Sequence, residues 1–182
     1  MKGNRAVLTA VVLLVLIIAG WWLFKRSHRG PSIDLIATFA SAQKKPAGGT
    51  FDVVDADLNG DKKRAIFTTP PSRMIWKVRV PDDGWLMLSL GMKPESWDKE
   101  GDGVLFRIGV SDGHTFEDLL TQHIDPFHNK ADRHWIPVAV DLSAYAGEEV
   151  EVIFNTNVSV PGKPDDARND TALFAAPAIV IR

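Results

Sequence analysis

The chain has 182 residues, with 23 Asp and Glu, 21 Lys and Arg, and no cysteine. The lack of cysteine excludes disulfide bonds, thiolate metal sites and a cysteine nucleophile. All 23 acidic residues follow residue 29, against 16 basic residues there, so this part of the chain carries a net charge near −7. Such a domain lacks the surplus of Lys and Arg that neutralises phosphates, and a nucleic-acid partner is therefore not expected.

Residues 6–24 form an uncharged run that is apolar except for Thr9. As an α-helix this run is about 28 Å long, close to the ~30 Å hydrocarbon core of a bilayer. A helix buried in a small globular domain keeps a polar face, and this run has none. We therefore expect a single transmembrane helix over residues 6–24, with the lipid bilayer as its partner.

The residues that follow the apolar run indicate a membrane interface. Trp21 and Trp22 lie where indole rings prefer the headgroup region, and Lys25 and Arg26 come directly after. The alternative is a cleaved signal peptide, but the run is longer than a usual apolar h-region and no A-x-A-like cleavage site follows it. The pattern favours a retained anchor.

Counting basic residues on the two sides of the helix does not settle its orientation. The short tail over residues 1–5 is basic, and so is the linker over 25–32, while the remaining chain is acidic. The acidic domain favours a cytoplasmic N-terminus and a C-terminal domain on the periplasmic or extracellular side. The expected location is a bacterial cell membrane, crossed once.

Beyond the linker the sequence changes to short segments of alternating polarity, separated by Gly, Pro, Asn and Asp. This pattern is typical of an all-β sandwich of two packed sheets. Residues 115–124 fit a strand or a short helix, and no convincing amphipathic helix is found elsewhere. The other predicted strands cover residues 33–40, 50–58, 62–68, 74–80, 85–92, 104–110, 134–142, 149–155 and 172–181.

Two stretches resemble a known family. Residues 135–147 with 150–154 resemble the "W…v.vDLS.yAG..v.l.f" pattern of galactose-binding-like jelly-roll domains in bacterial extracytoplasmic proteins. Residues 170–180 are similar to the "D.alW.dP.i" strand that closes these domains, although Phe174 replaces Trp and Ala176 replaces the acidic residue. The resemblance covers residues 33–182 and implies a jelly-roll β-sandwich. The departures put any inherited ligand or calcium site at the closing strand in doubt.

The first of these stretches also has a purely structural interpretation. Asp141 lies where a strand ends and can accept hydrogen bonds from the backbone of the following turn. We expect Tyr145 to close this corner with its hydroxyl and Gly147 to provide the positive φ of the next turn.

The segment from Asp55 to Asp61 fits the first half of a calcium-binding loop, with Asp55, Asp57 and Asn59 as oxygen ligands and Gly60 at the turn. The second half fails, because Ile66 occupies the position of the bidentate Glu. The alternative, which the pattern favours, is a β-hairpin turning at Asn59-Gly60.

Other polar clusters give weaker signals. His114, His123, His128 and His134 match no known zinc spacing and are interpreted as solvated loop residues. Ser111-Asp112-Gly113-His114 lacks a nucleophile elbow, and the carboxylates of residues 95–102 are interpreted as a solvated loop. The sequence therefore predicts neither an enzyme nor a cofactor.

Trp97 lies in a charged loop over residues 93–102. It could stack on a sugar or insert into a partner subunit, with polar contacts from Glu95, Asp98 and Arg107. Alternatively, Trp97 folds back to cover the end of the sandwich.

The functional hypothesis is a non-catalytic one. The chain is expected to be a single-pass membrane protein whose β-sandwich docks on other subunits of a membrane complex, for example an energy-transducing one. The second hypothesis is a membrane-anchored carbohydrate-binding module that uses Trp97 and the loops over 93–102 and 158–169 to bind envelope glycans. A hydrolase is the third.

Overall fold

The computed structural model describes residues 32–158, 162 and 164–182. The predicted transmembrane helix over 6–24, the tail, and the interface residues Trp21, Trp22, Lys25 and Arg26 lie outside the described residues. Within the described residues, no helix has the length and apolar character needed to span a bilayer. Residues Ser32–Arg182 form a compact unit.

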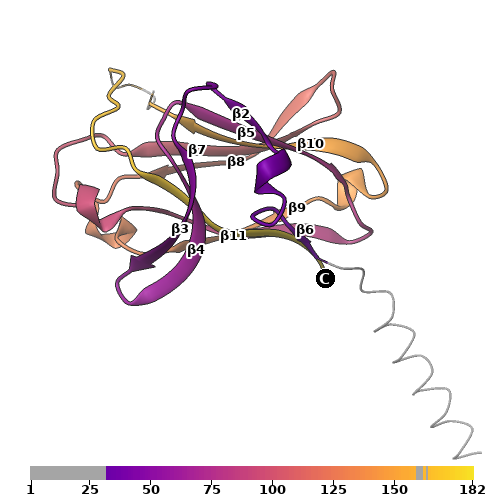
Figure 1. Cartoon of the computed structure of the whole chain (residues 1–182), viewed down its shortest axis with the longest axis horizontal. Helices are drawn as coiled ribbons and strands as arrows, with labels where there is room; N and C mark the ends of the chain where they lie inside the picture. Colours follow the sequence, from indigo (N-terminus) through magenta and orange to yellow (C-terminus); the bar gives the residue numbers. More distant parts are fainter. Residues whose placement is uncertain (1–31, 159–161, 163) are drawn as a thin grey trace, which may run out of the picture. The chain divides into compact units, whose positions relative to one another are not determined.

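This unit is built from strands and short 3₁₀ helices (Figure 1). The 3₁₀ helices are η1 (Phe39–Ser41), η2 (Pro94–Ser96), η3 (Lys130–Asp132) and η4 (Ser143–Tyr145). The strands are β1 (Ile33–Asp34), β2 (Gln43–Lys45), β3 (Phe51–Leu58), β4 (Asp61–Thr68), β5 (Ser72–Arg79), β6 (Gly84–Met92), β7 (Val104–Ser111), β8 (Phe116–Ile124), β9 (Ile136–Asp141), β10 (Glu149–Asn157) and β11 (Ala172–Ile181).

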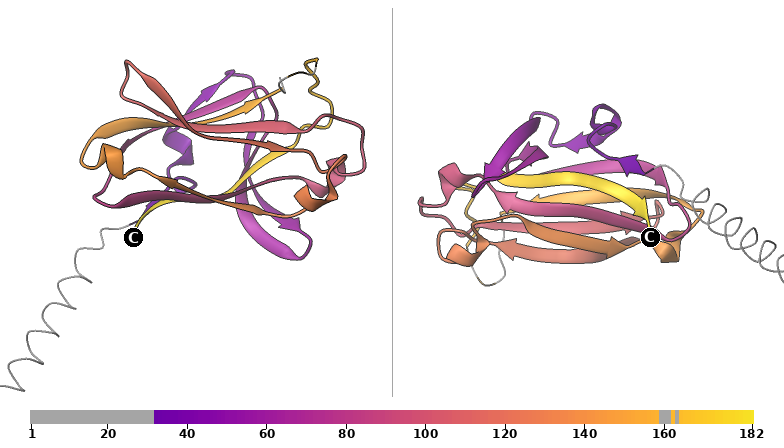
Figure 2. Two further views of the ribbon diagram at one scale, coloured as in Figure 1. Left: turned by 180° about the vertical axis from the view of Figure 1, so that it is seen from behind. Right: turned by 90° about the horizontal axis from the view of Figure 1, so that it is seen from below.

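The strands form two sheets that pack face to face (Figure 2). One sheet has the order β3-β4-β11-β6-β9, with β1 also paired to β11, and the other has the order β2-β5-β10-β7-β8. All pairings are antiparallel. The prediction of an all-β sandwich is confirmed, and the ambiguous segment 115–124 is the strand β8.

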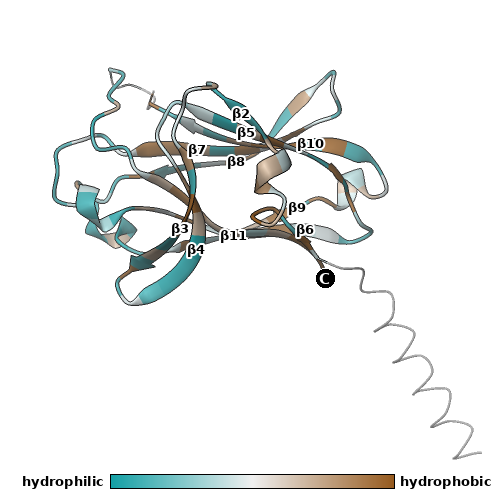
Figure 3. Ribbon diagram, viewed as in Figure 1, coloured by the Kyte–Doolittle hydropathy of each residue, from teal (hydrophilic) through white to brown (hydrophobic). Residues whose placement is uncertain are grey.

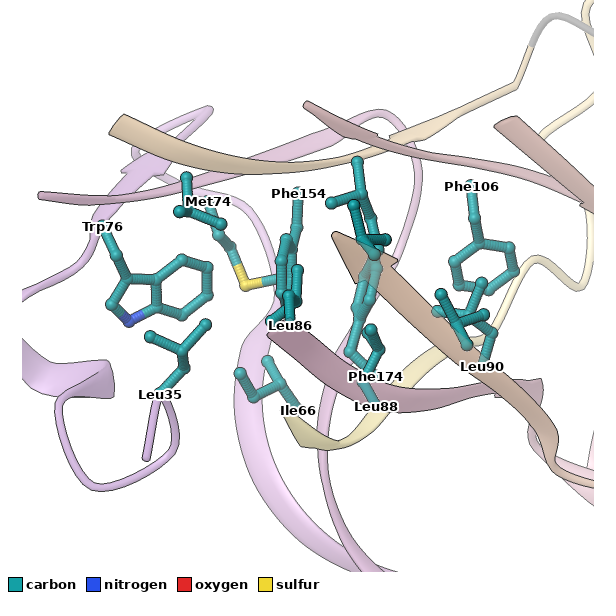
Figure 4. Packing of buried hydrophobic residues seen from close by; sticks show 14 of the residues in the cluster. Leu35, Ile66, Met74, Trp76, Leu86, Leu88, Leu90, Phe106, Phe154 and Phe174 are labelled. Atoms are coloured by element: carbon teal, nitrogen blue, oxygen red, sulfur yellow. The ribbon is translucent and has the colours of Figure 1, made fainter. Parts of the chain in front are cut away.

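The main core lies between the sheets, where alternate side chains of facing strands meet (Figure 4). The strands that enclose it contain hydrophobic segments (Figure 3). Phe154 of β10 stacks on Phe174 of β11 with ring centroids 5.0 Å apart, and Phe106 of β7 meets Phe174 edge-on at 5.2 Å. Each of these rings is fully buried. Aromatic pairs of this kind add about 0.5–1.5 kcal/mol to the stability gained by burial alone.

A second apolar cluster covers the outer face of the β11-containing sheet. The β3–β4 hairpin brings Leu58 against Trp97 and Trp135, together with Leu173 of β11. The indole nitrogen of Trp135 donates a hydrogen bond of 2.8 Å to the Asp61 carbonyl at the start of β4. The hairpin is therefore fastened to loops that are distant in sequence.

The β3–β4 connection is the hairpin that the sequence favoured. Asn59 (φ 56°) and Gly60 (φ 87°) are left-handed, as a type I′ turn requires, and the Asp57 carboxylate accepts a 2.6 Å hydrogen bond from the Gly60 amide. The Asn59 side chain donates to the Arg133 carbonyl. Of the calcium-loop candidates Asp55, Asp57 and Asn59, the turn engages Asp57 and Asn59 in these hydrogen bonds.

The prediction of a strand over 33–40 is wrong for most of its length. Only Ile33 and Asp34 pair with β11, since the Asp34 carboxylate then accepts hydrogen bonds from the amides of Ile36 and Ala37 and turns the chain. The short strand β2, over Gln43–Lys45, was not among the predicted strands.

The predicted structure of the corner after β9 is confirmed for Asp141 and Gly147. The Asp141 carboxylate accepts a 2.8 Å hydrogen bond from the Ser143 amide, which lowers the pKa of Asp141, and Gly147 has φ 77°. The role given to Tyr145 is wrong. Its hydroxyl donates to the Glu117 carboxylate on β8, at 2.6 Å, and so joins the corner to the other sheet.

The two ends of the sandwich differ. The described chain enters at β1, where Ile33 pairs with Ile179 near the C-terminus. The opposite end, to the left in Figure 1, carries the connections β6–β7, β8–β9 and β10–β11. The first residue of β11, Ala172, lies at this end and pairs with Met92 and Thr68. Since β11 has ten residues, roughly 30 Å separate its two ends.

Candidate functional site

Three loops meet at the end of the sandwich opposite the entry of the chain, and we call them the loop end: residues 93–103, 125–135 and 164–171. Short hydrogen bonds join the loops to one another. The Ser96 hydroxyl is 2.9 Å from the Thr171 hydroxyl, and the Lys93 amide donates to the Thr171 carbonyl. The Asn169 side chain donates to the Glu100 carbonyl at 2.9 Å.

Arg133 connects the first two loops. Its guanidinium donates to the carbonyls of Pro126 (2.8 Å) and Trp97 (2.7 Å) and pairs with the Asp98 carboxylate at 2.9 Å. His123, at the end of β8, lies 2.7 Å from the Asp102 carbonyl through its Nε2. These bonds hold the three loops together. A ligand that binds to loops already held in place loses less free energy to ordering them.

A hollow of about 510 Å³ opens in this support. Phe127 projects into solvent beside it, with 37% of its surface exposed. An exposed aromatic ring beside charged hydrogen-bonding groups can contact a ligand that has both apolar faces and hydroxyls. The residues that line the hollow are Glu100, Gly101, Asp102, Phe127, His128, Asp166 and Arg168.

His128 positions the Phe127 ring. The two rings meet edge to face, with centroids 4.9 Å apart and planes at 90°. The Nδ1 of His128 lies 2.9 Å from the Asp125 carboxylate, which also accepts from the His128 amide. An ionised carboxylate can only accept, so Nδ1 carries the proton, and Nε2 on the far side of the ring can accept a hydrogen bond when the ring is neutral.

Arg168 and Asp166 also line the hollow. The guanidinium of Arg168 makes a two-pronged ion pair with the Asp166 carboxylate, with Nη2 at 2.7 Å and Nε at 2.9 Å. These hydrogen bonds lower the pKa of Asp166 to about 2. Both groups therefore stay charged at any physiological pH, and together they present donors and acceptors to the hollow.

Asp170 lies beneath the same loops and is only 4% exposed. Among the described residues, neither of its carboxylate oxygens has a hydrogen-bond partner. Burial raises the pKa of Asp170 to about 7, and the nearby charges of Asp102, Asp166 and Asp125 add to this effect. Asp170 was not among the functional residues predicted from the sequence.

The structure separates the residues that were predicted to act together. Trp97 is 8% exposed, and its indole nitrogen donates to the Met92 carbonyl at 2.9 Å. It therefore covers the end of the sandwich, as the alternative interpretation held, and has no free face for a sugar. Glu95 and Asp98 are exposed in the same loop. Arg107 pairs with Asp118 of β8 and makes no described hydrogen bond or ion pair with these three residues.

Sequence reasoning missed Phe127. The residue lies in the polar stretch Asp125-Pro126-Phe127-His128-Asn129, a setting as unusual for an aromatic ring as that of Trp97. The available signal was the proline that precedes it, which favours an exposed turn.

Other hollows suit a ligand less well. A cavity of about 730 Å³ lies beside the part of β5 that β2 leaves unpaired, but its aromatic residue, Trp76, is 3% exposed. A cavity of about 360 Å³ on the outer face of the β6–β9 pair is lined mainly by apolar residues, among them Met87, Pro137 and Ala139. The loop end alone among these three offers an exposed ring with charged neighbours.

Comparison with known proteins gives one relative by sequence. No family model matches the chain. The chain is 38% identical over 104 residues to an uncharacterized protein of Archaeoglobus fulgidus, a match that covers 57% of the chain and 25% of that protein. The chain thus spans about a quarter of the length of this relative.

Three solved structures that resemble the chain are carbohydrate-binding modules. One is the second family 51 module of Clostridium perfringens ZmpB, solved with GlcNAc (TM-score 0.58, 15% identity, 84% of this chain and 32% of that chain). Another is the family 51 module of a C. perfringens GH95 protein, solved with methyl-galactose (0.53, 15%, 82% and 99%). A third, TmCBM61, was solved with β-1,4-galactotriose (0.51, 11%, 82% and 94%). At these identities the likeness shows the jelly-roll β-sandwich fold and nothing more.

Proposed function

We propose that the chain is a carbohydrate-binding protein of the cell envelope, which binds glycans in the hollow at the loop end and is held at the membrane by residues 6–24. The observation that carries the proposal is the exposed ring of Phe127 beside Arg168, Asp166 and His128. Sugar rings offer an apolar face for an aromatic side chain and hydroxyls for charged partners, and this hollow offers both kinds of contact.

The fold supports the proposal. The modules named above bind GlcNAc, methyl-galactose and a galactotriose on the same type of sandwich. A shared fold does not carry a ligand over by itself, so the argument depends on the residues of the hollow. A binding module needs no catalytic group, and the proposal assigns none.

The position of the hollow also supports it. The described chain enters the sandwich next to the C-terminus, at the end opposite the loop end. A tether attached there leaves the hollow unobstructed by the point of attachment. In this proposal the anchor keeps the module near envelope glycans.

Docking on a membrane complex, the first hypothesis from the sequence, receives less support. The three solved structures named above are carbohydrate-binding modules, and the described loop end has the composition of a ligand site. Docking on other subunits remains a prediction.

The test is the affinity of the purified chain for a glycan panel that includes GlcNAc, methyl-galactose and β-1,4-galactotriose, measured by calorimetry. Phe127→Ala should weaken binding about tenfold or more, because truncating a central aromatic contact typically costs more than 1 kcal/mol. Phe116→Ala is the matched control. Among the described residues, Phe116 is the other exposed Phe, at 42%, and it lies at the start of β8, away from the loop end.

Two results would contradict the proposal. One is the absence of binding to every glycan in the panel. The other is an equal affinity of Phe127→Ala and the parent chain, provided that circular dichroism shows both to be folded.

A further inference from the structure

The edge of β5 that faces away from β10 is only partly covered. β2 pairs with residues 73–75 of this edge, and β5 continues as far as Arg79. Among the described residues, β10 is therefore the only strand that pairs with residues 76–79. An unpaired strand edge presents a row of N–H and C=O groups with which another extended chain can pair. We call residues 76–79, on this side, the open edge.

The hydrogen bonds just after β5 show which backbone groups point to the open side. The Val80 amide donates to the Glu148 carbonyl, and the Val80 carbonyl accepts from the Gly147 amide, so the backbone groups of Val80 point towards the start of β10. Successive residues of a strand point their backbone groups to opposite sides, and no register shift interrupts the pairing of β5 with β10. The N–H and C=O groups of Lys77 and Arg79 therefore point to the open edge.

A hollow of about 730 Å³ lies along the open edge. Besides β5, polar residues ahead of β2 and within it line this hollow, among them Thr38, Ser41 and Gln43. An extended segment of four residues is about 13 Å long, and pockets of roughly 300–1,000 Å³ hold ligands of that size. The hollow lacks the exposed aromatic ring of a sugar site, so its main binding groups are those of the backbone.

The exposed side chains of the open edge are basic. Lys77 and Arg79 lie two residues apart and so point to the same face of the sheet. Neither makes an ion pair among the described residues. Their neighbours across β10 are Glu151 and Glu149. Opposite charges on adjacent strands attract and like charges repel, so a strand added on the other side of β5 should also be acidic.

A second copy of the chain is a poor occupant of this edge. Two copies joined edge to edge through β5 would set two basic pairs, each of Lys77 and Arg79, side by side. Like charges on directly adjacent strands destabilise a sheet. The charge pattern therefore favours a different chain, one that carries carboxylates at alternate positions.

We propose that the open edge of β5 binds an extended acidic segment of another protein, which adds to the sheet as a further strand. Backbone hydrogen bonds to Lys77 and Arg79 provide the affinity, and the two basic side chains select the partner. The open edge lies beside Ile33, where the described chain enters the sandwich, whereas the glycan hollow lies at the loop end. Both sites can therefore be occupied at once.

The experiment measures the binding of a fluorescent (Glu-Val)3 peptide to the full chain in mild detergent by anisotropy, with detergent alone as the blank. Its alternating carboxylates fit the basic pair in either strand direction. We expect saturable binding below about 1 mM. Three control peptides should bind about tenfold more weakly or not at all: (Lys-Val)3, a Glu-Glu-Glu-Val-Val-Val peptide without the alternation, and (Glu-Val)3 with N-methylated amides that cannot donate.

The test variant combines Lys77→Gln with Arg79→Gln and should lose about tenfold in affinity. The matched control combines Lys62→Gln with Arg64→Gln on β4. These two residues are also exposed, lie two apart and face acidic residues of the neighbouring strand, so both variants lose the same charge. The control should keep the affinity of the parent chain. In the parent chain, the peptide should slow hydrogen exchange of the amides within residues 76–79.

Four results would each overturn the proposal. They are no binding of (Glu-Val)3 up to about 1 mM, equal affinities of the test variant and the parent chain, equal binding of (Lys-Val)3, and slowed exchange only outside residues 76–79. A dimer seen by light scattering, with slow exchange at residues 76–79 before peptide is added, would identify a second copy as the occupant instead. Glycan affinity is not part of this readout, so its outcome is independent of the proposed function.

Discussion

Trp97 and Phe127 show how the surroundings of a side chain decide its role. Both are large rings in polar loops. Trp97 packs with Trp135 and Leu58 and donates its indole N–H to the Met92 carbonyl, so its ring and its polar atom are both used inside the protein. Phe127 contacts the ring of His128 and remains 37% exposed. Stability is therefore expected to depend on Trp97 and recognition on Phe127.

Trp97→Phe should lower the free energy of unfolding by about 1–3 kcal/mol, because it leaves the buried Met92 carbonyl without its donor. Urea denaturation measures this, with Trp85→Phe at a half-buried position as the control. Glycan affinity of the folded variant should stay close to that of the parent chain. A variant of full stability that had lost glycan binding would show that Trp97 is the contact residue after all.

The ion pair of Asp166 and Arg168 should persist in acid. Since Arg168 lowers the pKa of Asp166 to about 2, the stabilisation from this pair is present above the unfolded pKa near 3.8 and is lost as the pH falls through about 2. An NMR titration of the Asp166 carboxyl carbon should give a midpoint near 2. In Arg168→Gln the midpoint should return towards 3.8. A midpoint near 3.8 in the parent chain would contradict the described geometry.

At the scale of elements, the β3–β4 hairpin connects the sheet that contains β11 to the loop end. Its turn depends on the left-handed backbone of Gly60, at φ 87°. Gly60→Ala should destabilise the domain by about 1–2 kcal/mol, although an added methyl would meet no neighbouring atom within 4 Å.

Gly48→Ala provides the matched control for this prediction. Gly48 also has open space for a methyl, but it lacks the positive φ. This change should be neutral or stabilising by about 0.4–1 kcal/mol. Chemical denaturation of the two variants compares them directly, and equal stabilities would mean that the turn is not constrained as described.

Most elements follow from local sequence because alternation of polarity marks a half-buried strand wherever it occurs. The strands from β3 onward were predicted with small errors at their ends, except β8, whose segment was left open between a strand and a short helix. The failure over 33–40 has a local cause, since the Asp34 carboxylate turns the chain at once. The short strand β2 (Gln43–Lys45) was missed because its pairing partner, β5, lies about thirty residues later in the sequence.

The candidate site was harder to predict than the fold. The loops over 93–102 and 158–169 were named, and they provide Glu100, Asp102, Asp166 and Arg168 to the hollow. The burial of Trp97 depends on Leu58 and Trp135, and the environment of Asp170 depends on Asp102. Contacts between residues so distant in sequence leave no periodic signal, so they require the folded structure.

At the scale of the whole molecule, the proposal combines a membrane anchor with a self-contained domain. The full chain should sediment with membranes and resist extraction by alkaline carbonate, while detergent should release it. A chain that begins at Ser32 should be soluble and folded, because the main core lies within residues 35–179. Extraction of the full chain by carbonate alone would contradict the anchor.

The central claim is that the loop end binds carbohydrate. The most direct measurement is an NMR titration of the isotope-labelled chain that begins at Ser32 with β-1,4-galactotriose and GlcNAc, following the backbone amides. We predict that saturable shifts cluster at Glu100–Asp102, Phe127–His128 and Asp166–Arg168. Shifts confined to the cavity beside β5, around Ile75–Arg79, or no shifts at millimolar sugar, would contradict it.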